Sequence, residues 1–145
     1  MSGNAGCIFC KIARGEAPAH RVYEDAHTIV FMDIFPVTDG HALVVTKDHF
    51  ENIYEVDEAA LAAIARTSHR VAAAIRDELA PDGLMVFQLN GQAAGQTVFH
   101  YHMHLMPRTQ GEELRLHTRV PGTPERLAET ALRLRSALER LGRSS

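Results

Sequence analysis

The segment Phe99-His100-Tyr101-His102-Met103-His104-Leu105-Met106-Pro107 places three of the chain's nine histidines at every second position, with apolar residues between and after them. Side chains of a β-strand alternate between the two faces of its sheet. As a strand, this segment would hold His100, His102 and His104 in one row at a spacing of about 6.6 Å. On a helix the same residues would spread over roughly 200° and could not share a site. A row of imidazoles indicates either a metal site or a phosphate-handling site.

Turn and periodicity signals along the rest of the chain predict an α+β fold. Further strands are predicted at 20–23, 28–32, 41–46 and 84–89, where β-branched and apolar residues cluster between loop signals. A short helix is predicted within 7–15, a long one from the N-cap Asp57 to Leu79, and a final one within 123–142. We therefore predict a five-stranded antiparallel sheet with one long helix, a short N-terminal helix and a C-terminal helical extension, whose apolar stripe serves either core or dimer packing.

Composition indicates one globular domain over 1–145, since the chain has a typical domain length and no internal repeat or linker. The formal net charge of −3 gives no broad basic field for nucleic acid or an anionic membrane, so neither is expected as a partner. No apolar run approaches the ~18 residues of a membrane span, and the N-terminal residues have no secretory-signal pattern. We expect a cytoplasmic protein.

The two cysteines of the chain, Cys7 and Cys10, form a C-x-x-C pair. In an intracellular protein such a pair is more often half of a metal site or a redox pair than a structural disulfide. No thioredoxin-like βαβ pattern surrounds the pair, which favours metal over redox chemistry. A metal would need two further ligands, for which the histidines are candidates.

Residues 96–106, QTVFHYHMHLM, resemble the histidine triad (HIT) motif His-φ-His-φ-His-φ-φ, where φ is apolar. The resemblance continues through CIFCKI at 7–12, FMDI at 31–34 and Gly40-His41, and it covers about 7–108, with 109–145 as an extension. It implies a HIT-like fold and is most similar to the Hint-like branch of nucleotide phosphoramidases that carry a C-x-x-C zinc site.

The resemblance implies catalytic roles for His102, His104, His41 and His100. His102 would attack the α-phosphorus of a purine nucleotide (an AMP or GMP moiety) and form a nucleotidyl-histidine, because a neutral imidazole is both a good nucleophile and a good leaving group. His104 and His41 would contact the phosphate oxygens and stabilise the charge that develops there.

The resemblance also implies a nucleotide pocket. Asp33 would accept hydrogen bonds from the ribose hydroxyls, and polar contacts near the phosphate or ribose would come from Asn90, Gln96 and Thr97. The apolar walls around the base would be Phe9, Ile12, Phe31 and Ile34.

A structural zinc is implied as well, with Cys7, Cys10, His49 and His100 as a closed Cys2His2 ligand set. The other four histidines have no marked spacing, and we expect them to be exposed to solvent: His20, His27, His69 and His117.

Several activities stay open. The leading prediction is hydrolysis of purine nucleoside 5′-phosphoramidates, but Gln96-Thr97 before the triad and Pro107-Arg108 after it also resemble the branch that cleaves dinucleoside polyphosphates. A nucleotide-binding module that acts through partners, and a metallohydrolase with zinc on the histidine row, are further alternatives. The resemblance also implies a homodimer formed through the long helix and a sheet edge, and it leaves 112–120 as a segment that can carry substrate specificity.

Overall fold

The structure is a computed structural model that describes residues 5–116 and 119–144. In chain order it contains α1 (Ile8–Ala13), β1 (Arg21–Glu24), β2 (Thr28–Met32), β3 (Ala42–Thr46), α2 (Glu58–Leu79), β4 (Gly83–Phe87), the single 3-10 turn η1 (Gln92–Ala94), β5 (His102–Arg108) and α3 (Pro124–Ser144). The strands form one sheet in the order β1-β2-β3-β5-β4, and every neighbouring pair is antiparallel. The predicted α+β fold with a five-stranded antiparallel sheet and one long helix is confirmed.

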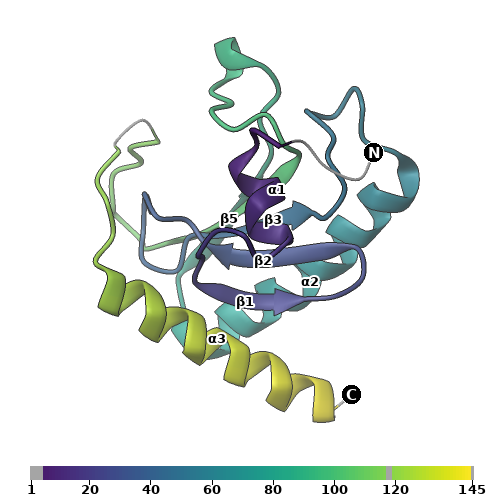
Figure 1. Cartoon of the computed structure of the whole chain (residues 1–145). Helices are drawn as coiled ribbons and strands as arrows, with labels where there is room; N and C mark the ends of the chain where they lie inside the picture. The colour runs from purple at the N-terminus through teal and green to yellow at the C-terminus, as the bar shows by residue number, and fades with distance from the viewer. Residues whose placement is uncertain (1–4, 117–118, 145) are drawn as a thin grey trace.

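Helices lie on both faces of the sheet (Figure 1). Both faces are covered because the central strands β2 and β3 are mostly apolar and buried throughout. On one face Val30, Val44 and Leu105 pack against α2 and α3. On the other face Phe31 and Leu43 pack against α1. Residues 101–105 alternate in the same way, so Tyr101, Met103 and Leu105 join the α2 and α3 side, as the period of two predicts. His102 and His104 therefore face the side of the sheet that carries α1.

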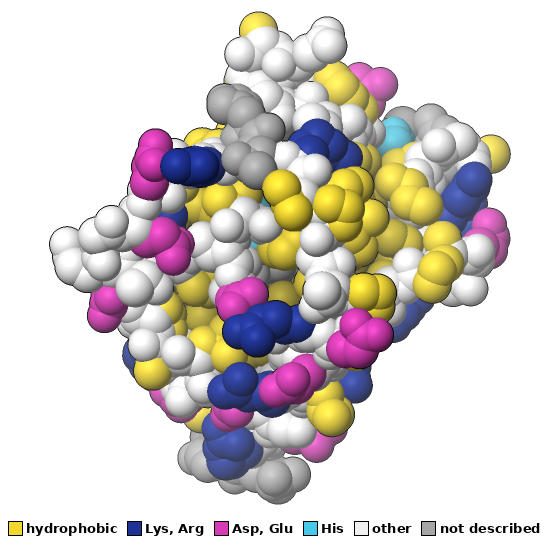
Figure 2. Space-filling view, turned by 90° about the vertical axis from the view of Figure 1, so that its left-hand side faces the viewer, with side chains coloured by type: hydrophobic (Ala, Val, Ile, Leu, Met, Phe, Trp, Pro, Cys, Tyr) yellow, Lys and Arg dark blue, Asp and Glu magenta, His cyan; other side chains and the backbone are white. Residues whose placement is uncertain are grey.

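The two long helices are amphipathic. Asp57 begins α2 as its N-cap, with its Oδ1 accepting from the backbone N–H of Ala60 at 2.8 Å. Helix α3 packs against α2 and β1, and Leu134 lies in the core with no exposed surface. Figure 2 shows side chains of both charges on the outer surface of the lower part of the molecule, where α3 runs. The apolar stripe of α3 thus serves the core of its own chain.

One prediction about the histidine segment is wrong. Strand β5 begins at His102, and His100 precedes it in a bend, so the three histidines do not stand in one row on one strand. The backbone N–H of Tyr101 donates to the carbonyl oxygen of Phe50 at 2.7 Å, which ties this segment to the loop after β3. The side chain of His100 turns toward the cysteines of α1 instead of the histidines of β5.

The remaining local predictions differ by small amounts. Strand and helix ends shift by one or two residues, as is usual for element boundaries. Within 111–116 and 119–120 the chain forms no strand. His27 and His69 are exposed as predicted, whereas His20 is half-buried, and His117 lies outside the described residues. No helix among the described residues is both long and apolar enough to cross a bilayer.

Candidate active site and metal centre

A cavity of about 760 Å³ lies on the α1 side of the sheet. Its walls include most of the residues that the sequence indicated: Phe9, Ile12, Phe31, Asp33, Ile34, His41, Gln96, Thr97, His102 and His104. Two predicted residues do not line it, Asn90 and His100. The cavity is therefore an apolar chamber with a small group of histidines and one carboxylate on its wall, the usual composition of a small-molecule site.

His102 is held in one orientation and one tautomer. It stands opposite Val45 of β3, and its Nδ1 donates to the carbonyl oxygen of His100 at 2.6 Å. Because Nδ1 carries the proton, Nε2 keeps its lone pair. Burial lowers the pKa of His102, with the carbonyl of His100 and the carboxylate of Asp33 opposing that shift. A neutral, buried imidazole whose second nitrogen keeps its lone pair is suited to nucleophilic attack.

His41 and His104 are hydrogen-bonded to each other, and the backbone decides which of the two donates. The backbone N–H of Val37 donates to Nδ1 of His41 at 3.1 Å, so a neutral His41 carries its proton on Nε2. That nitrogen lies 3.0 Å from Nδ1 of His104, which then accepts. The proton of His104 is thereby on Nε2, where it can be donated to a ligand. Phe87 stacks on His104 with ring centroids 4.5 Å apart and an interplanar angle of 4°.

Both histidines of this pair stay uncharged near neutral pH. Burial lowers the pKa of His104 to about 3, assisted by the neighbouring His102 and His41. Burial also lowers the pKa of His41, although Asp33 opposes the shift; Oδ2 of Asp33 lies 3.6 Å from Nε2 of His41. The wall that would face a phosphate thus offers N–H donors and a lone pair without positive charge.

The loop from Asp33 to His41 is shaped by its own backbone. Oδ1 of Asp33 accepts from the N–H of Phe35 at 2.9 Å, and the N–H of Asp33 donates to the carbonyl oxygen of His41 at 3.0 Å. Gly40 has a φ of +89°, and a Cβ at this position would lie 2.6 Å from Cδ1 of Leu79. Glycine is therefore favoured directly before His41, because other residues rarely adopt this φ.

Asn90 and Gln96 brace the loop between β4 and β5. The side chain of Gln96 accepts from the N–H of Gly91 at 2.7 Å and donates to the carbonyl oxygens of Glu51 at 2.7 Å and Val98 at 3.1 Å. Both N–H groups of its amide are used in this way, so Gln96 shapes the cavity wall by holding the backbone around it. Asn90 exchanges two hydrogen bonds of 2.7 Å with the side chain of Gln88 and stands outside the cavity.

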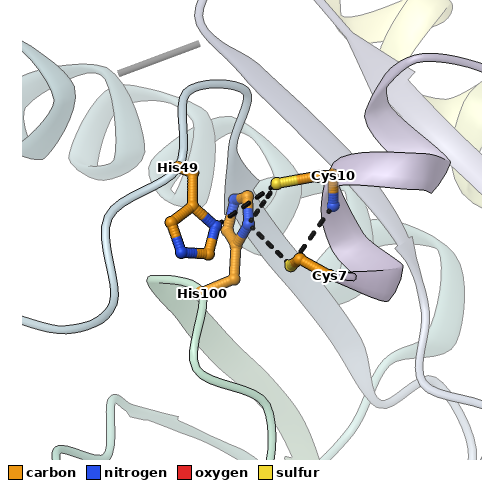
Figure 3. A group of neighbouring side chains, drawn as sticks. All are labelled: Cys7, Cys10, His49 and His100. Carbon is orange, nitrogen blue, oxygen red and sulfur yellow. Dashed lines mark hydrogen bonds between the residues drawn. The ribbon is translucent and has the colours of Figure 1, made fainter. Parts of the chain in front are cut away.

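Four possible metal ligands converge beside the cavity: Cys7, Cys10, His49 and His100 (Figure 3). Nδ1 of His100 lies 3.3 Å from Sγ of Cys7, and Sγ of Cys10 lies 3.3 Å from Nδ1 of His49. All four ligand atoms lie within 4.8 Å of one another. A tetrahedral zinc with bonds of 2.0–2.3 Å separates its ligands by about 3.3–3.8 Å, so the donor set fits this ion in both chemistry and spacing.

His100 connects the metal centre to the cavity. Its Nε2 donates to the carbonyl oxygen of Thr46 at 2.6 Å, which leaves the lone pair of Nδ1 directed toward the thiols, the arrangement of a metal-binding histidine. Its own backbone carbonyl accepts the hydrogen bond from Nδ1 of His102. His100 thus lies among the four candidate ligands through its side chain and orients His102 through its backbone.

Several lining residues were missed by the sequence reasoning, among them Leu43, Phe87, Leu116 and Arg119. Leu43 and Phe87 carry no signal that separates them from ordinary strand residues. Arg119 lies in the segment 112–120, which the sequence marked only as a possible source of specificity. Its guanidinium carbon stands 4.1 Å from the centroid of the Phe35 ring.

Comparisons with known proteins agree with this architecture. The family model of the HIT domain matches residues 14–111. "Protein hit" of Bacillus subtilis is 50% identical over 102 residues, which are 70% of each chain. A crystal structure of a zinc-bound histidine triad family protein from Mycobacterium smegmatis superposes with a TM-score of 0.88 at 38% identity and covers 99% of this chain and 100% of that one.

One relative with a named activity is also similar to this chain. Adenylylsulfatase HINT3 of Arabidopsis thaliana is 35% identical over 118 residues, which are 77% of this chain and 60% of that protein. The region matched by the family model contains His41, His102 and His104, all five strands of the sheet and all of α2. The chain therefore belongs to the HIT family of nucleotide-binding proteins.

Proposed function

We propose that this protein is a nucleotide hydrolase that cleaves the bond between the α-phosphate and its leaving group in purine nucleoside 5′-phosphoramidates or related nucleotidyl substrates. The observation that carries the proposal is the state of His102, which is neutral, is fixed through Nδ1 by the carbonyl of His100, and lines the cavity beside His104. An imidazole held in this way has one reactive nitrogen and one direction of attack.

The reaction follows in two steps. Nε2 of His102 bonds to the α-phosphorus, and the bond to the leaving group breaks and gives that group its electron pair. A leaving amine takes up a proton from solvent as this bond breaks. The nucleotidyl-imidazolium that forms keeps its proton on Nδ1, where the carbonyl of His100 stabilises the positive charge. Water then attacks phosphorus and passes a proton to solvent, the bond from phosphorus to Nε2 breaks, and the nucleoside monophosphate leaves with His102 neutral again. Throughout, the N–H of His104 donates to a phosphoryl oxygen, and His41 holds His104 in the donor tautomer.

The rest of the cavity suits a nucleoside. The apolar side chains of Phe9, Phe31 and Ile34 would pack on the base, and exposure of 55% for Ile34 leaves it available at the rim. The free lone pairs of Asp33 would accept from the ribose hydroxyls. Phe9 also contacts His102 edge-on, with ring centroids 5.0 Å apart. The same phenylalanine would therefore contact both the bound base and the nucleophile.

Replacing His102 with Ala tests the mechanism. We expect turnover to fall by about a thousandfold or more, since the nucleophile is lost, and we expect the covalent nucleotidyl adduct to disappear from the mass spectrum of the protein. Nucleotide binding should persist. His69→Ala is the matched control, because His69 is exposed on α2 away from the cavity. Unchanged turnover in His102→Ala would refute the covalent mechanism.

Two other activities are distinguished by the same assays. Faster turnover of diadenosine tetraphosphate than of adenosine 5′-phosphoramidate would move the protein to the dinucleoside polyphosphate branch, and no turnover with intact binding would make it a nucleotide-binding module. Ligand atoms of Asp33, His41 and His104 also lie within 4.8 Å of one another. A metallohydrolase that used them would lose activity on chelation and form no covalent adduct.

A structural zinc belongs to the same proposal. Cys7, Cys10, His49 and His100 would hold it, and a filled Cys2His2 set leaves no position for substrate. Thiolate ligands need reducing surroundings, which suits a cytoplasmic location.

We also propose a homodimer. Strand β4 is an outer strand of the sheet, and Val86 on it is 51% exposed, so an unpaired edge with apolar surface is available to a second copy. Static light scattering at working concentration is expected to give about twice the monomer mass of 16.0 kDa. A monomer mass would exclude the dimer.

A further inference from the structure

The charges on the cavity wall are few. Among the described residues that line it, Asp33 is the only carboxylate and Arg119 is the only lysine or arginine. A nucleotide brings at least one negative charge, and a leaving group bonded through oxygen gains more as it departs. Arg119 is therefore the one cationic side chain of the described cavity wall that can meet that charge directly.

Arg119 is held at the cavity by neighbouring contacts. We define the C-terminal strap as residues 119–123, which connect to α3 and run beside the loop after β2 (Figure 1). The N–H of Gly122 donates to the carbonyl oxygen of Ile34 at 2.9 Å, and a Cβ on Gly122 would lie 3.1 Å from Cδ of Pro36. The guanidinium of Arg119 then stands over the Phe35 ring.

The guanidinium of Arg119 has no ionic partner within the part of the chain that the structure describes. Arg108, Arg115 and Arg126 each pair with a carboxylate, whereas no described carboxylate lies within ion-pair distance of Arg119. A cation–π contact orients an arginine while leaving its N–H edge open to an anion. The strap thus presents an unpaired, oriented cation to the cavity.

We propose that Arg119 is a specificity-determining residue that favours substrates whose leaving group on the α-phosphate is an anion, namely a phosphate, a polyphosphate or a sulfate, over substrates that release a neutral amine. This inference rests on the proposed hydrolase function and narrows its substrate class. Planar guanidinium N–H pairs match the oxygens of phosphate and sulfate in two-point hydrogen bonds, and such charge-assisted bonds are strong.

The charge balance explains why the effect depends on the leaving group. When the bond from phosphorus to a bridging oxygen breaks, the electron pair stays on that oxygen, and an already anionic group gains further negative charge. Arginine remains protonated, so Arg119 stabilises this charge without transferring a proton. An amine takes up a proton, leaves with its electron pair and is uncharged. Arg119 therefore does not stabilise the departure of an amine.

Kinetics of Arg119→Gln test the proposal. Arg119→Lys is the second variant, which keeps the positive charge but lacks the planar guanidinium group. We expect kcat/KM for adenosine 5′-phosphosulfate and diadenosine tetraphosphate to fall by about tenfold to a hundredfold in Arg119→Gln, with partial recovery in Arg119→Lys. For adenosine 5′-phosphoramidate the change should stay within about threefold. Arg115→Gln is the control, because Arg115 is exposed, pairs with Glu113 and does not line the cavity. Equal losses on all three substrates, or no loss on the anionic ones, would overturn the proposal.

Binding separates this inference from the proposed function. Calorimetry on His102→Ala should show tighter binding of ADP than of AMP, because the β-phosphate occupies the place of an anionic leaving group. Adding Arg119→Gln should remove that preference. If the unaltered protein hydrolyses none of the three substrates, the hydrolase proposal fails, but a preference for ADP that depends on Arg119 still supports the anion subsite. A preference that persists in Arg119→Gln, or no preference at all, overturns it.

Discussion

At the scale of single residues, backbone groups decide the protonation of the cavity histidines. A carbonyl fixes the proton of His102 on Nδ1, whereas an amide N–H fixes the proton of His41 on Nε2. The two neighbours therefore adopt opposite tautomers, and His104 follows His41 through their hydrogen bond. One imidazole is left as a nucleophile and another as a donor, although all three have the same intrinsic chemistry.

These assignments predict how activity depends on pH. The charged form of a buried imidazole is disfavoured, so the pKa of His102 lies below its ordinary value of 6.5. We expect kcat/KM to stay level from about pH 8 down through 6.5 and to fall only at lower pH, when His102 becomes protonated. A decline centred at 6.5 or above would contradict the assignment.

The loss of activity expected at low pH must be distinguished from loss of the folded state. Since His104 has a pKa of about 3 in the folded protein and 6.5 as its ordinary value, the unfolded chain binds more protons between those values. The free energy of unfolding is therefore expected to fall as the pH drops below 6.5. Circular dichroism at each pH shows whether lost activity reflects protonation or loss of fold.

At the scale of elements, α1 depends on its surroundings. With six residues it is too short to be stable alone, and it is held by packing of Phe9 and Ile12 on the sheet and by the cysteines at its start. The ligands come from three separate segments, namely the start of α1, the loop after β3 and the bend before β5. A metal there would join all three to the carbonyl that orients His102.

His49→Ala tests this connection without altering a cavity residue, since His49 does not line the cavity. We expect lower zinc content by atomic emission and a free energy of unfolding reduced by about 3 kcal/mol or more, because loss of a metal is among the changes that destabilise proteins most. The exposed His69→Ala should change neither. Loss of zinc with unchanged stability would show that the metal does not hold these segments together.

At the scale of the whole molecule, α3 completes the core. Leu134 and Ala137 have no exposed surface and belong to the cluster that includes the sheet and α2. The helix follows the segment that matches the family model, yet its removal would uncover the face of the sheet opposite the cavity.

Two leucines of α3 test whether 1–145 behaves as one domain. Leu134→Ala should lower the free energy of unfolding by about 2–5 kcal/mol because it opens a cavity in the core. Leu132→Ala, 56% exposed on the same helix, should change it by less than about 0.5 kcal/mol. Denaturant unfolding followed by both fluorescence and circular dichroism gives these values. Similar small effects of both substitutions, or two separate transitions, would mean that α3 is not integrated with the sheet.

Much of the fold followed from local periodicity. Alternation of period two placed Met103 and Leu105 on the core side, and spacing of three to four residues placed the apolar stripes of α2 and α3, because each pattern reflects the geometry of a single element. The C-x-x-C pair and the histidine motif also indicated the chemistry, and the resemblance that they carry named most of the residues that line the cavity.

What the sequence by itself determined is therefore the set of elements, the family and the residues with reactive groups. The tertiary structure decided how those groups are used. It directs the side chain of His100 away from His102 and His104 and toward the cysteines. It uses the amides of Gln96 and Asn90 to hold the loop between β4 and β5. It also brings Phe87 and Arg119 to the cavity. These outcomes depend on contacts between segments far apart in the chain, such as Cys7 with His100 and Ile34 with Gly122, and a periodic pattern within one element carries no information about such contacts.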